Sequence, residues 1–299
     1  MRIIRYYQDE KVNLAAVTDE DKVYPLIFGN FLELVEKAKE TQKSPLKLVE
    51  ESIQDSLPIE KEVSQLNLLV PIEAPEVWAC GVTYEKSRDA RNYEATQGKL
   101  DANTFYDKVY DAVRPELFFK STKDRTVGPN QEVCLRSDSN WQIPEPELGL
   151  VLDHSGEILG YIVGNDMSCR DIEGENPLYL PQAKMWKNSC SLGPAIRLAE
   201  TVEDPYDLVI NCKIYRQGAP IFDGSANTSQ LKRRYDELSD YLTRDNVVFD
   251  GTVLLTGTCI VPPDDFTLQE GDQVDIQISG IGTLSNPIVA TGKKHALSN

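Results

Sequence analysis

The sequence predicts a β-rich α+β fold that begins with a small α/β unit. Short strand-like segments recur from residue 3 to residue 278, whereas amphipathic helical stripes occur in only a few places. Two apolar runs flank the turn-prone stretch Asp153-His154-Ser155-Gly156, which predicts a β-hairpin in the middle of the chain. A chain of 299 residues can bury one large core or two modest ones. We therefore expect an accessory domain over residues 1–70 and a main domain over residues 71–299.

The composition is that of a folded protein with a strong acidic bias. The 31 basic and 48 acidic residues give a formal net charge of −17, which argues against a nucleic-acid partner. A small anionic substrate remains compatible, because a bound metal and one lysine can reverse the field locally. No apolar run approaches the roughly 20 residues that cross a bilayer, and residues 1–9 turn polar too soon for a signal peptide. The six scattered cysteines lack C-x-x-C spacing, so we expect a reduced, cytoplasmic protein with no membrane partner.

The first 70 residues predict three strands followed by two helices. The strand-like segments are residues 3–7, 13–17 and 23–27, and a helix follows over residues 31–39. The second helix begins at Pro45, with Ser44 as its N-cap and Leu46, Val49 and Ile53 on one stripe. These residues contain no functional cluster, and we expect them to pack against the main domain or a second subunit.

A hydrophobic strand over residues 77–82 opens the main domain and is followed by a long polar segment over residues 85–113. A polar helical insertion after a buried strand favours a lid over a cleft, although a peripheral helical hairpin has the same pattern. The next strand, residues 114–120, carries Glu116 among aromatic residues. Apolar surroundings raise the pKa of a carboxyl group, which suits a general acid. The alternative is a structural ion pair between Glu116 and Arg114 or Lys120.

The central hairpin carries three carboxylates at its open end. Glu145 and Glu147 lie two residues apart, so both side chains project to the same face of an extended strand. A two-residue turn at Ser155-Gly156 places Glu145 opposite Asp166 and Glu147 opposite Gly164. An odd loop would turn Asp166 to the other face unless a bulge intervenes, so this prediction depends on the register.

Three converging carboxylates repel one another, and a bound cation relieves that repulsion. Oxygen ligands without sulfur or imidazole suit Mg²⁺ or Mn²⁺. The alternative is a solvated, acidic strand end. Proline residues bracket Glu145 and an apolar run follows Glu147, which suits a rigid pocket wall better than a frayed surface.

The remaining segments add one lysine and one glycine step of interest. Lys184 lies between apolar residues, which fits a proton shuttle or an anion clamp as well as a snorkelling surface lysine. Residues 228–243 predict an amphipathic helix and residues 253–261 a buried strand. Within that strand the Gly257-Thr258 step either presents a hydroxyl and backbone amides to a ligand or is a simple bulge. Further strands are predicted over residues 190–196, 208–215 and 274–278.

Taken together, these motifs resemble the fumarylacetoacetate hydrolase superfamily over roughly residues 75–290. The resemblance rests on Pro144-Glu145-Pro146-Glu147-Leu148 with Asn165-Asp166, then Lys184, residues 255–258 and Gly280-Ile281-Gly282-Thr283-Leu284. Three further segments, residues 110–116, 136–139 and 175–182, are most similar to the superfamily's 2-keto-3-deoxy-D-arabinonate dehydratases. The resemblance implies a mixed β-sandwich roll as the catalytic domain.

The resemblance also implies roles for particular residues. Glu145, Glu147 and Asp166 would hold Mg²⁺, Lys184 would contact the substrate, and Glu116 would act near the leaving group. Candidates for holding the substrate's hydroxyl and carboxylate groups are Thr83, Arg88 and Thr258. The superfamily's hydrolases activate water with a histidine–carboxylate pair, but here no histidine lies near residues 83–85 or 116. That departure favours a lyase over a hydrolase.

The implied activity is dehydration of a 2-keto-3-deoxy sugar acid, with 2,5-dioxopentanoate as the product, in pentose oxidation. A cation at the ketone would acidify the C3 protons, and elimination then needs a base near C3 and an acid near C4. Alternatives on the same metal platform are an acylpyruvate hydrolase and an oxaloacetate decarboxylase. A third class is a protein that binds keto acids without consuming them. The protein is expected to be a homo-oligomer, either a dimer or a tetramer.

Overall fold

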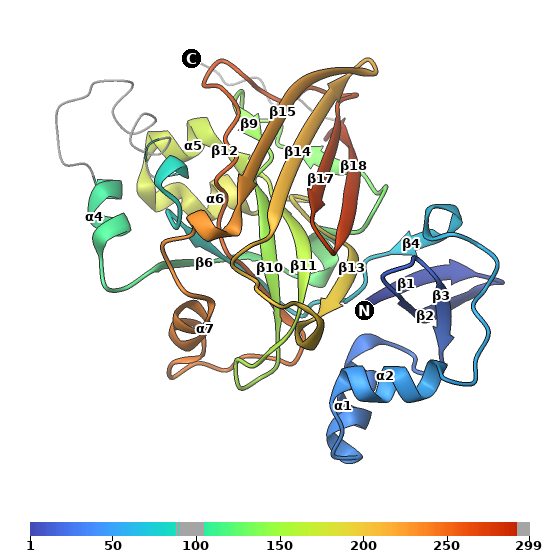
Figure 1. Ribbon diagram of the computed structural model, residues 1–299. Helices are drawn as coiled ribbons and strands as arrows, with labels where there is room; N and C mark the ends of the chain where they lie inside the picture. The colour runs from blue at the N-terminus through green and yellow to red at the C-terminus, as the bar shows by residue number, and fades with distance from the viewer. Residues whose placement is uncertain (88, 90–104, 292–299) are drawn as a thin grey trace.

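A large mixed β-sheet runs through the molecule and carries the central hairpin among its inner strands (Figure 1). The structure is a computed structural model that describes residues 1–87, 89 and 105–291. The main path of the large sheet has the strand order β3-β2-β1-β13-β11-β10-β16-β5-β6, with β4 paired to β1 and β7 paired to β13. The strands of its inner part are β5 (Val77–Gly81), β6 (Glu116–Ser121), β7 (Thr126–Val127), β10 (Pro146–Leu152), β11 (Ile158–Asp166), β13 (Cys190–Leu198) and β16 (Thr252–Leu255).

The first 70 residues continue this sheet, because β1 pairs with β13 through Arg2↔Arg197 and Ile3↔Ile196. The predicted strands and helices are confirmed here, and Ser44 caps the second helix by accepting a hydrogen bond from the Lys47 amide. Val49 is buried, with Leu46 and Ile53 partly so. The elements are β1 (Arg2–Gln8), β2 (Lys11–Val17), β3 (Val23–Leu26), α1 (Phe31–Glu40), α2 (Pro45–Ile53), η1 (Val63–Gln65) and β4 (Asn67–Leu69).

A second, five-stranded sheet packs on the large sheet (Figure 1), with the order β15-β14-β17-β18-β8. Its strands are β8 (Val133–Leu135), β14 (Val209–Arg216), β15 (Ala219–Asn227), β17 (Gln273–Ile278) and β18 (Gly282–Ala290). A two-stranded pair, β9 (Gln142–Ile143) and β12 (Ser168–Cys169), lies beside the open end of the hairpin. The helices of this part are α4 (Phe105–Asp111), η2 (Lys123–Arg125), α5 (Arg170–Glu175), η3 (Pro177–Tyr179), α6 (Leu180–Lys184), η4 (Ala199–Thr201), η5 (Thr228–Gln230) and α7 (Tyr235–Thr243).

Hydrophobic cores fill both faces of the large sheet. Alternate residues of β10 divide between them: Leu148 and Leu150 face the core shared with the five-stranded sheet, whereas Val151 faces the core under α1 and α2. Because both faces are covered, every residue from Pro146 to Leu152 is buried. The hairpin is therefore a rigid support for side chains at its open end.

The hairpin has the predicted register at its open end, but its turn differs from the predicted one. Glu147 pairs with Gly164, and the Asp166 amide donates to the Glu145 carbonyl at 3.0 Å. The turn is not the predicted two-residue loop. The Asp153 amide donates to the Glu157 carbonyl, which leaves three residues between them, and a β-bulge near Leu152 then shifts the pairing back. Two one-residue changes cancel, so Glu145 faces Asp166 as expected.

Two predicted elements are shorter than the sequence pattern indicates. The helix expected over residues 228–243 is α7, which begins only at Tyr235, because residues 228–230 form a separate turn and Arg234 is extended. The strand expected over residues 253–261 ends at Leu255. Gly257 there has a φ of +95°, in the left-handed region where glycine carries no steric penalty, and this conformation breaks the strand. In the part of the chain that the structure covers, no helix has both the length and the apolar character needed to traverse a bilayer.

Candidate metal centre and active site

Three carboxylates converge where β10 begins and β11 ends. Glu145, Glu147 and Asp166 each offer an oxygen, and these oxygens lie within 4.8 Å of one another. The three residues are at most 4% exposed. The alternative interpretation of a solvated, acidic strand end is therefore wrong.

Each carboxylate has one oxygen in contact with a different cationic or amide group. Arg170 Nη2 lies 2.7 Å from Glu145 Oε1, and the Gly257 amide donates to Glu147 Oε2 at 2.6 Å. Lys120 Nζ lies 2.6 Å from Asp166 Oδ1. Such contacts fix the orientation of ligand side chains in metal sites. The backbone amide expected at the Gly257-Thr258 step thus binds a carboxylate of the protein itself.

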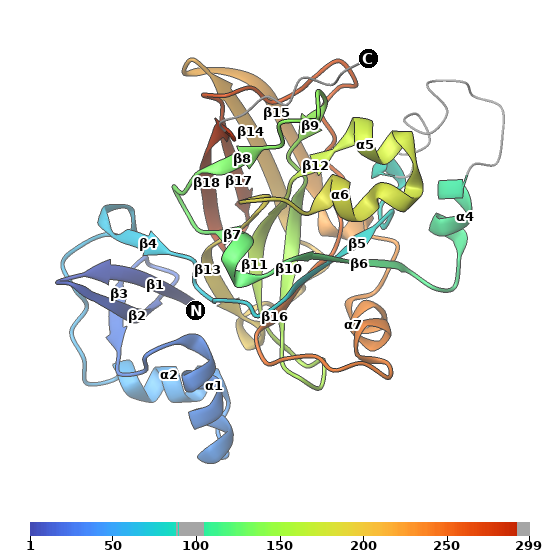
Figure 2. The same ribbon diagram turned by 180° about the vertical axis from the view of Figure 1, so that it is seen from behind.

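Lys184 lies at the centre of this group. It ends α6, a short helix that Figure 2 shows beside α5, and its side chain is fully buried. Lys184 Nζ donates to Glu145 Oε2 at 2.6 Å, to Asp166 Oδ2 at 3.1 Å and to Ser168 Oγ at 2.5 Å. Its ammonium also lies 3.3 Å from Glu173 Oε1. The interpretation of Lys184 as a snorkelling surface lysine is therefore wrong.

Among the described residues of the cluster, carboxylates outnumber cations. Four carboxylates, Glu145, Glu147, Asp166 and Glu173, lie together with three cationic side chains, Lys120, Arg170 and Lys184. The pKa of Glu147 lies well above its usual range because burial disfavours its charged form, and the charges of Asp166 and Glu145 add to this effect. The positive charge of Lys184 and the hydrogen bond from the Gly257 amide lower the pKa of Glu147 but offset the rise only in part.

A hard divalent cation fits this donor set. The three ligand groups offer only oxygen, and their remaining negative charge is buried, where it is costly without a counter-charge. Mg²⁺ prefers carboxylate oxygens and keeps sites for water or substrate oxygens. The residues present therefore suit the cation that the sequence predicts.

A cavity of about 530 Å³ lies next to the cluster. Both Glu116 and Glu173 line it, and the C-terminal part of α4 with its following residue forms one wall through Val109 and Ala112. Glu116 pairs across the sheet with Gly81, and a Cβ at residue 81 would collide with the Glu116 carboxylate. Glycine at this position thus gives the Glu116 side chain its room.

The candidate substrate-binding residues have different surroundings. Thr83 is buried, and its hydroxyl donates to the Thr256 carbonyl at 2.7 Å. The Thr258 hydroxyl is hydrogen-bonded to the backbone of Ile260. Arg88 lies outside the described residues, as does much of the segment expected to form a lid. The substrate-binding roles of the three residues stay predictions.

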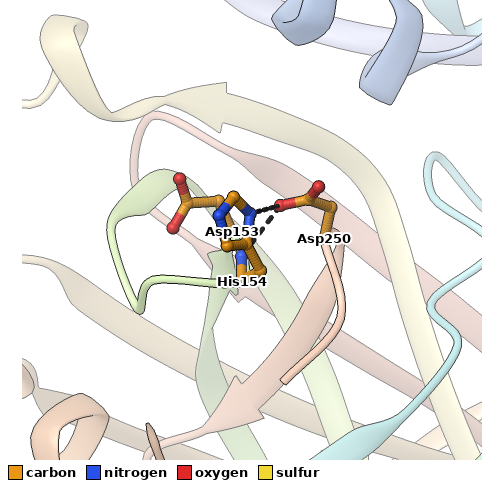
Figure 3. Close-up of side chains that lie close together, drawn as sticks. All are labelled: Asp153, His154 and Asp250. Carbon is orange, nitrogen blue, oxygen red and sulfur yellow. Dashed lines mark hydrogen bonds and ion pairs between the residues drawn. The ribbon is translucent and has the colours of Figure 1, made fainter. Parts of the chain in front are cut away.

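A second group of potential ligands lies at the turn of the same hairpin (Figure 3). His154 Nδ1 lies 2.8 Å from Asp250 Oδ1, and both side chains are exposed. Asp153 Oδ1 accepts from the Ser155 amide and hydroxyl and from the Glu157 amide, and its Oδ2 accepts from Lys39 Nζ at 2.8 Å. Figure 3 shows the Asp153 carboxylate pointing away from Asp250. The hydrogen bonds of Asp153, together with the contact between His154 and Asp250, shape the turn of the hairpin.

Three charged contributors to the main cluster are not predicted from the sequence. The sequence suggests Lys120 only as a partner of Glu116, and it gives no role to Arg170 or Glu173. A charged residue flanked by apolar ones, as in Phe118-Phe119-Lys120, was the available indication for the lysine.

Comparisons with known proteins show the family to which this chain belongs. The family model described as the C-terminal domain of fumarylacetoacetate (FAA) hydrolase matches residues 87–289. A 2-dehydro-3-deoxy-D-arabinonate dehydratase of Saccharolobus solfataricus is 48% identical over 227 residues, which are 76% of each chain. A probable 2-keto-3-deoxyxylonate dehydratase of Haloferax volcanii is 48% identical over 258 residues, 86% of this chain and 87% of its own. The solved structure of a 2-keto-3-deoxy-D-arabinonate dehydratase complexed with magnesium and 2,5-dioxopentanoate matches with a TM-score of 0.84 and 37% identity, covering 98% of this chain and 100% of its own.

Proposed function

Because this chain belongs to the fumarylacetoacetate hydrolase family, we propose that it is a magnesium-dependent hydro-lyase acting on a 2-keto-3-deoxy sugar acid. The reaction converts 2-dehydro-3-deoxy-D-arabinonate to 2,5-dioxopentanoate and water, a step of pentose catabolism. The observation that carries the proposal is the 48% identity to two dehydratases over most of the chain. The buried carboxylate cluster beside a cavity supports it.

Glu145, Glu147 and Asp166 are the proposed ligands of Mg²⁺, and Mn²⁺ is a possible substitute. The cation, when bound, withdraws electron density from the carboxylate and ketone oxygens of a keto acid and so acidifies the C3 protons. The protein contributes a preformed, dry site, because Arg170, Lys120 and backbone groups already orient the carboxylates.

Lys184 and Glu116 are the proposed proton carriers. Lys184 lies among the proposed ligand carboxylates. We therefore propose that its neutral amine, formed when the ammonium gives up one proton to solvent, takes the C3 proton. Glu116 lines the cavity, so we assign it the proton that leaves with the C4 hydroxyl as water. These two transfers leave a C3–C4 double bond beside the ketone.

Formation of the product's aldehyde then requires Glu116 to accept a proton and Lys184 to donate one. Glu116, now a carboxylate, takes a proton from C5, and Lys184 returns its proton to C3. The resulting enol at C4–C5 becomes the aldehyde when its hydroxyl proton is lost and C4 gains one from solvent. Both residues are back in their starting states, and one water has been released. Thr83, Arg88 and Thr258 remain the proposed contacts for the substrate's hydroxyl and carboxylate groups.

A panel of keto acids tests the proposed reaction. We expect 2,5-dioxopentanoate from 2-dehydro-3-deoxy-D-arabinonate, no turnover in EDTA, and recovery on adding Mg²⁺ or Mn²⁺. Cleavage of a carbon–carbon bond in an acylpyruvate or in oxaloacetate, without dehydration of the sugar acid, would instead identify a hydrolase or a decarboxylase. Tight binding of every acid without product would identify a binding protein.

We make three further proposals, on the location, the assembly and the domains of the protein. The six cysteines are buried and unpaired, which supports a reducing location such as the cytoplasm. Ile27 and Leu57 are 90% and 87% exposed, which supports the burial of this surface in a homo-oligomer, a dimer or a tetramer. We also keep residue 70 as the boundary between an accessory and a catalytic domain. Light scattering and limited proteolysis test the second and third points.

A further inference from the structure

Among the residues that the structure describes, four polar side chains lie within 3.3 Å of the Lys184 ammonium, and three of them belong to the metal side of the site. Glu145 and Asp166 are proposed ligands, and Ser168 follows Asp166 on the same chain segment. An ammonium has three hydrogens, and these three groups accept all of them. Held by them alone, the Lys184 side chain would be drawn toward the carboxylates and away from a substrate in the cavity.

Glu173 is the fourth neighbour and lies on the other side. It comes from α5, is 2% exposed, and places Oε1 at 3.3 Å from Lys184 Nζ. Glu173 lines the described cavity, as Glu116 does, whereas Glu145, Asp166 and Ser168 are not among its lining residues. A carboxylate at that place attracts the ammonium toward the cavity, because opposite charges interact strongly where water is excluded.

The helix that carries Glu173 also reaches the ligands. Arg170, one turn earlier on α5, lies 2.7 Å from Glu145 Oε1. Asp171 anchors the same helix by accepting from the Ser139 hydroxyl and the Asn140 amide. The short helix α5 therefore places Arg170 beside Glu145 and Glu173 beside Lys184. The contacts of Asp171, which lies between Arg170 and Glu173, anchor the helix.

We propose that Glu173 is a positioning residue that holds the Lys184 ammonium toward the cavity. This inference rests on the proposed function, in which Lys184 carries the C3 proton. Glu173 acts through Lys184, so its loss should impair the chemical step and leave substrate and cation binding almost intact. Displacing a reacting group by about 1 Å can cost on the order of 100-fold in rate.

The test compares Glu173→Gln with Glu175→Gln. Glutamine preserves the size of the side chain and removes its charge, and Glu175 is an exposed residue of the same helix. For Glu173→Gln we expect kcat to fall about 10- to 100-fold, with KM and the Mn²⁺ affinity measured by calorimetry each within about threefold of wild type. Glu175→Gln should match wild type in all three. Glu173→Asp, which keeps the charge, should recover part of kcat.

Several outcomes would overturn the inference. A wild-type kcat in Glu173→Gln shows that the charge is not needed, and a parallel loss of Mn²⁺ affinity shows that Glu173 acts through the ligands instead. If Glu173→Gln does not fold, Glu173→Asp decides: a fall in kcat at unchanged Mn²⁺ affinity supports the proposal, and an unchanged kcat refutes it. Absence of dehydration by the wild-type enzyme would instead reject the proposed function itself.

Discussion

At the scale of single residues, Lys120 shows how a buried charge organises the site. Its ammonium contacts Asp166 Oδ1 at 2.6 Å and donates to the carbonyls of Met167 at 2.7 Å and Lys184 at 2.5 Å. Two hydrogen bonds to backbone carbonyls and one ion pair thus hold the ammonium in place. Lys120 thus joins a proposed metal ligand to the backbone that carries the proposed proton carrier.

Lys120→Met should destabilise the metal-free protein severely. Removing one partner of a buried ion pair leaves the other charge uncompensated, which costs about 3–5 kcal/mol. Denaturant unfolding in EDTA measures the loss. Lys39→Met is the matched control, because Lys39 also pairs with an aspartate of this hairpin but is half exposed, and it should cost only about 1 kcal/mol.

A double variant then tests whether Lys120 and Asp166 stabilise the folded protein as a pair. Lys120→Met combined with Asp166→Asn should be less destabilised than the sum of the two single variants, since no charge of the pair is left alone. Strict additivity of the two losses would show that Lys120 and Asp166 are not coupled in the folded protein.

Glu147→Gln should lose cation binding and keep the fold. Burial and the neighbouring carboxylates hold the pKa of Glu147 well above its usual range, so its ionised form is unfavourable without a cation. Replacing it with a neutral amide should leave the unfolding temperature in EDTA at or above the wild-type value. Calorimetry should show Mg²⁺ affinity reduced at least about 100-fold. Unchanged affinity would remove Glu147 from the ligand set.

The three proposed ligands and Lys184 could be singled out from the sequence because they lie on patterned elements. The two-residue spacing of Glu145 and Glu147 is local information, and only the hairpin count relates them to Asp166. Lys120 and Arg170 could not be assigned in this way, because Lys120 is 46 residues from Asp166 and the partner of each depends on tertiary packing. Glu173 was missed for the same reason.

At the scale of elements, the hairpin β10–β11 shows what register reasoning can and cannot supply. The predicted loop length was wrong, yet the pairing at the open end was right, because the bulge near Leu152 compensates the odd loop. Both strands are buried on both faces, so a one-residue slip would place the wrong side chains in two cores. Packing therefore fixes the register, and the turn adapts to it.

The turn of the hairpin makes a pH-dependent contribution to stability. Burial raises the pKa of Asp153, but hydrogen bonds from Lys39, Ser155 and the backbone of Glu157 bring it down to about 2. The charged form is favoured in the folded state, so the stabilisation is present above the unfolded-state pKa and is lost as the pH falls toward 2. The shift corresponds to about 2 kcal/mol.

Asp153→Asn should therefore lower the free energy of unfolding by about 2 kcal/mol at pH 7. The difference from wild type should stay constant down to about pH 5 and shrink steadily between pH 5 and pH 2. Urea unfolding across this range measures it. A difference independent of pH would show that the loss comes from packing and not from the charge.

At the scale of the whole molecule, cation binding should appear as global stability. The proposed ligands come from both strands of a hairpin that contacts both cores, so the cation binds the folded chain and not the unfolded one. At 100 times the dissociation constant, Mg²⁺ should add about 2.7 kcal/mol to the free energy of unfolding. Thermal unfolding with and without EDTA measures this effect. Glu147→Gln is the control, and an equal Mg²⁺ effect in that variant would point to binding elsewhere.

Removing residues 1–70 would take β1 away from its partner strand β13. A fragment starting at residue 71 would lose the partner of Ile196 and Arg197 and leave part of the β13 edge without hydrogen-bonding partners. It would also lose α1 and α2, which cover Val151, Ile162 and Val253 on the large sheet. The truncated fragment would expose apolar surface and an unpaired strand edge, so we expect it to precipitate or self-associate during purification. The segment without a catalytic group is thus what keeps the remainder in solution.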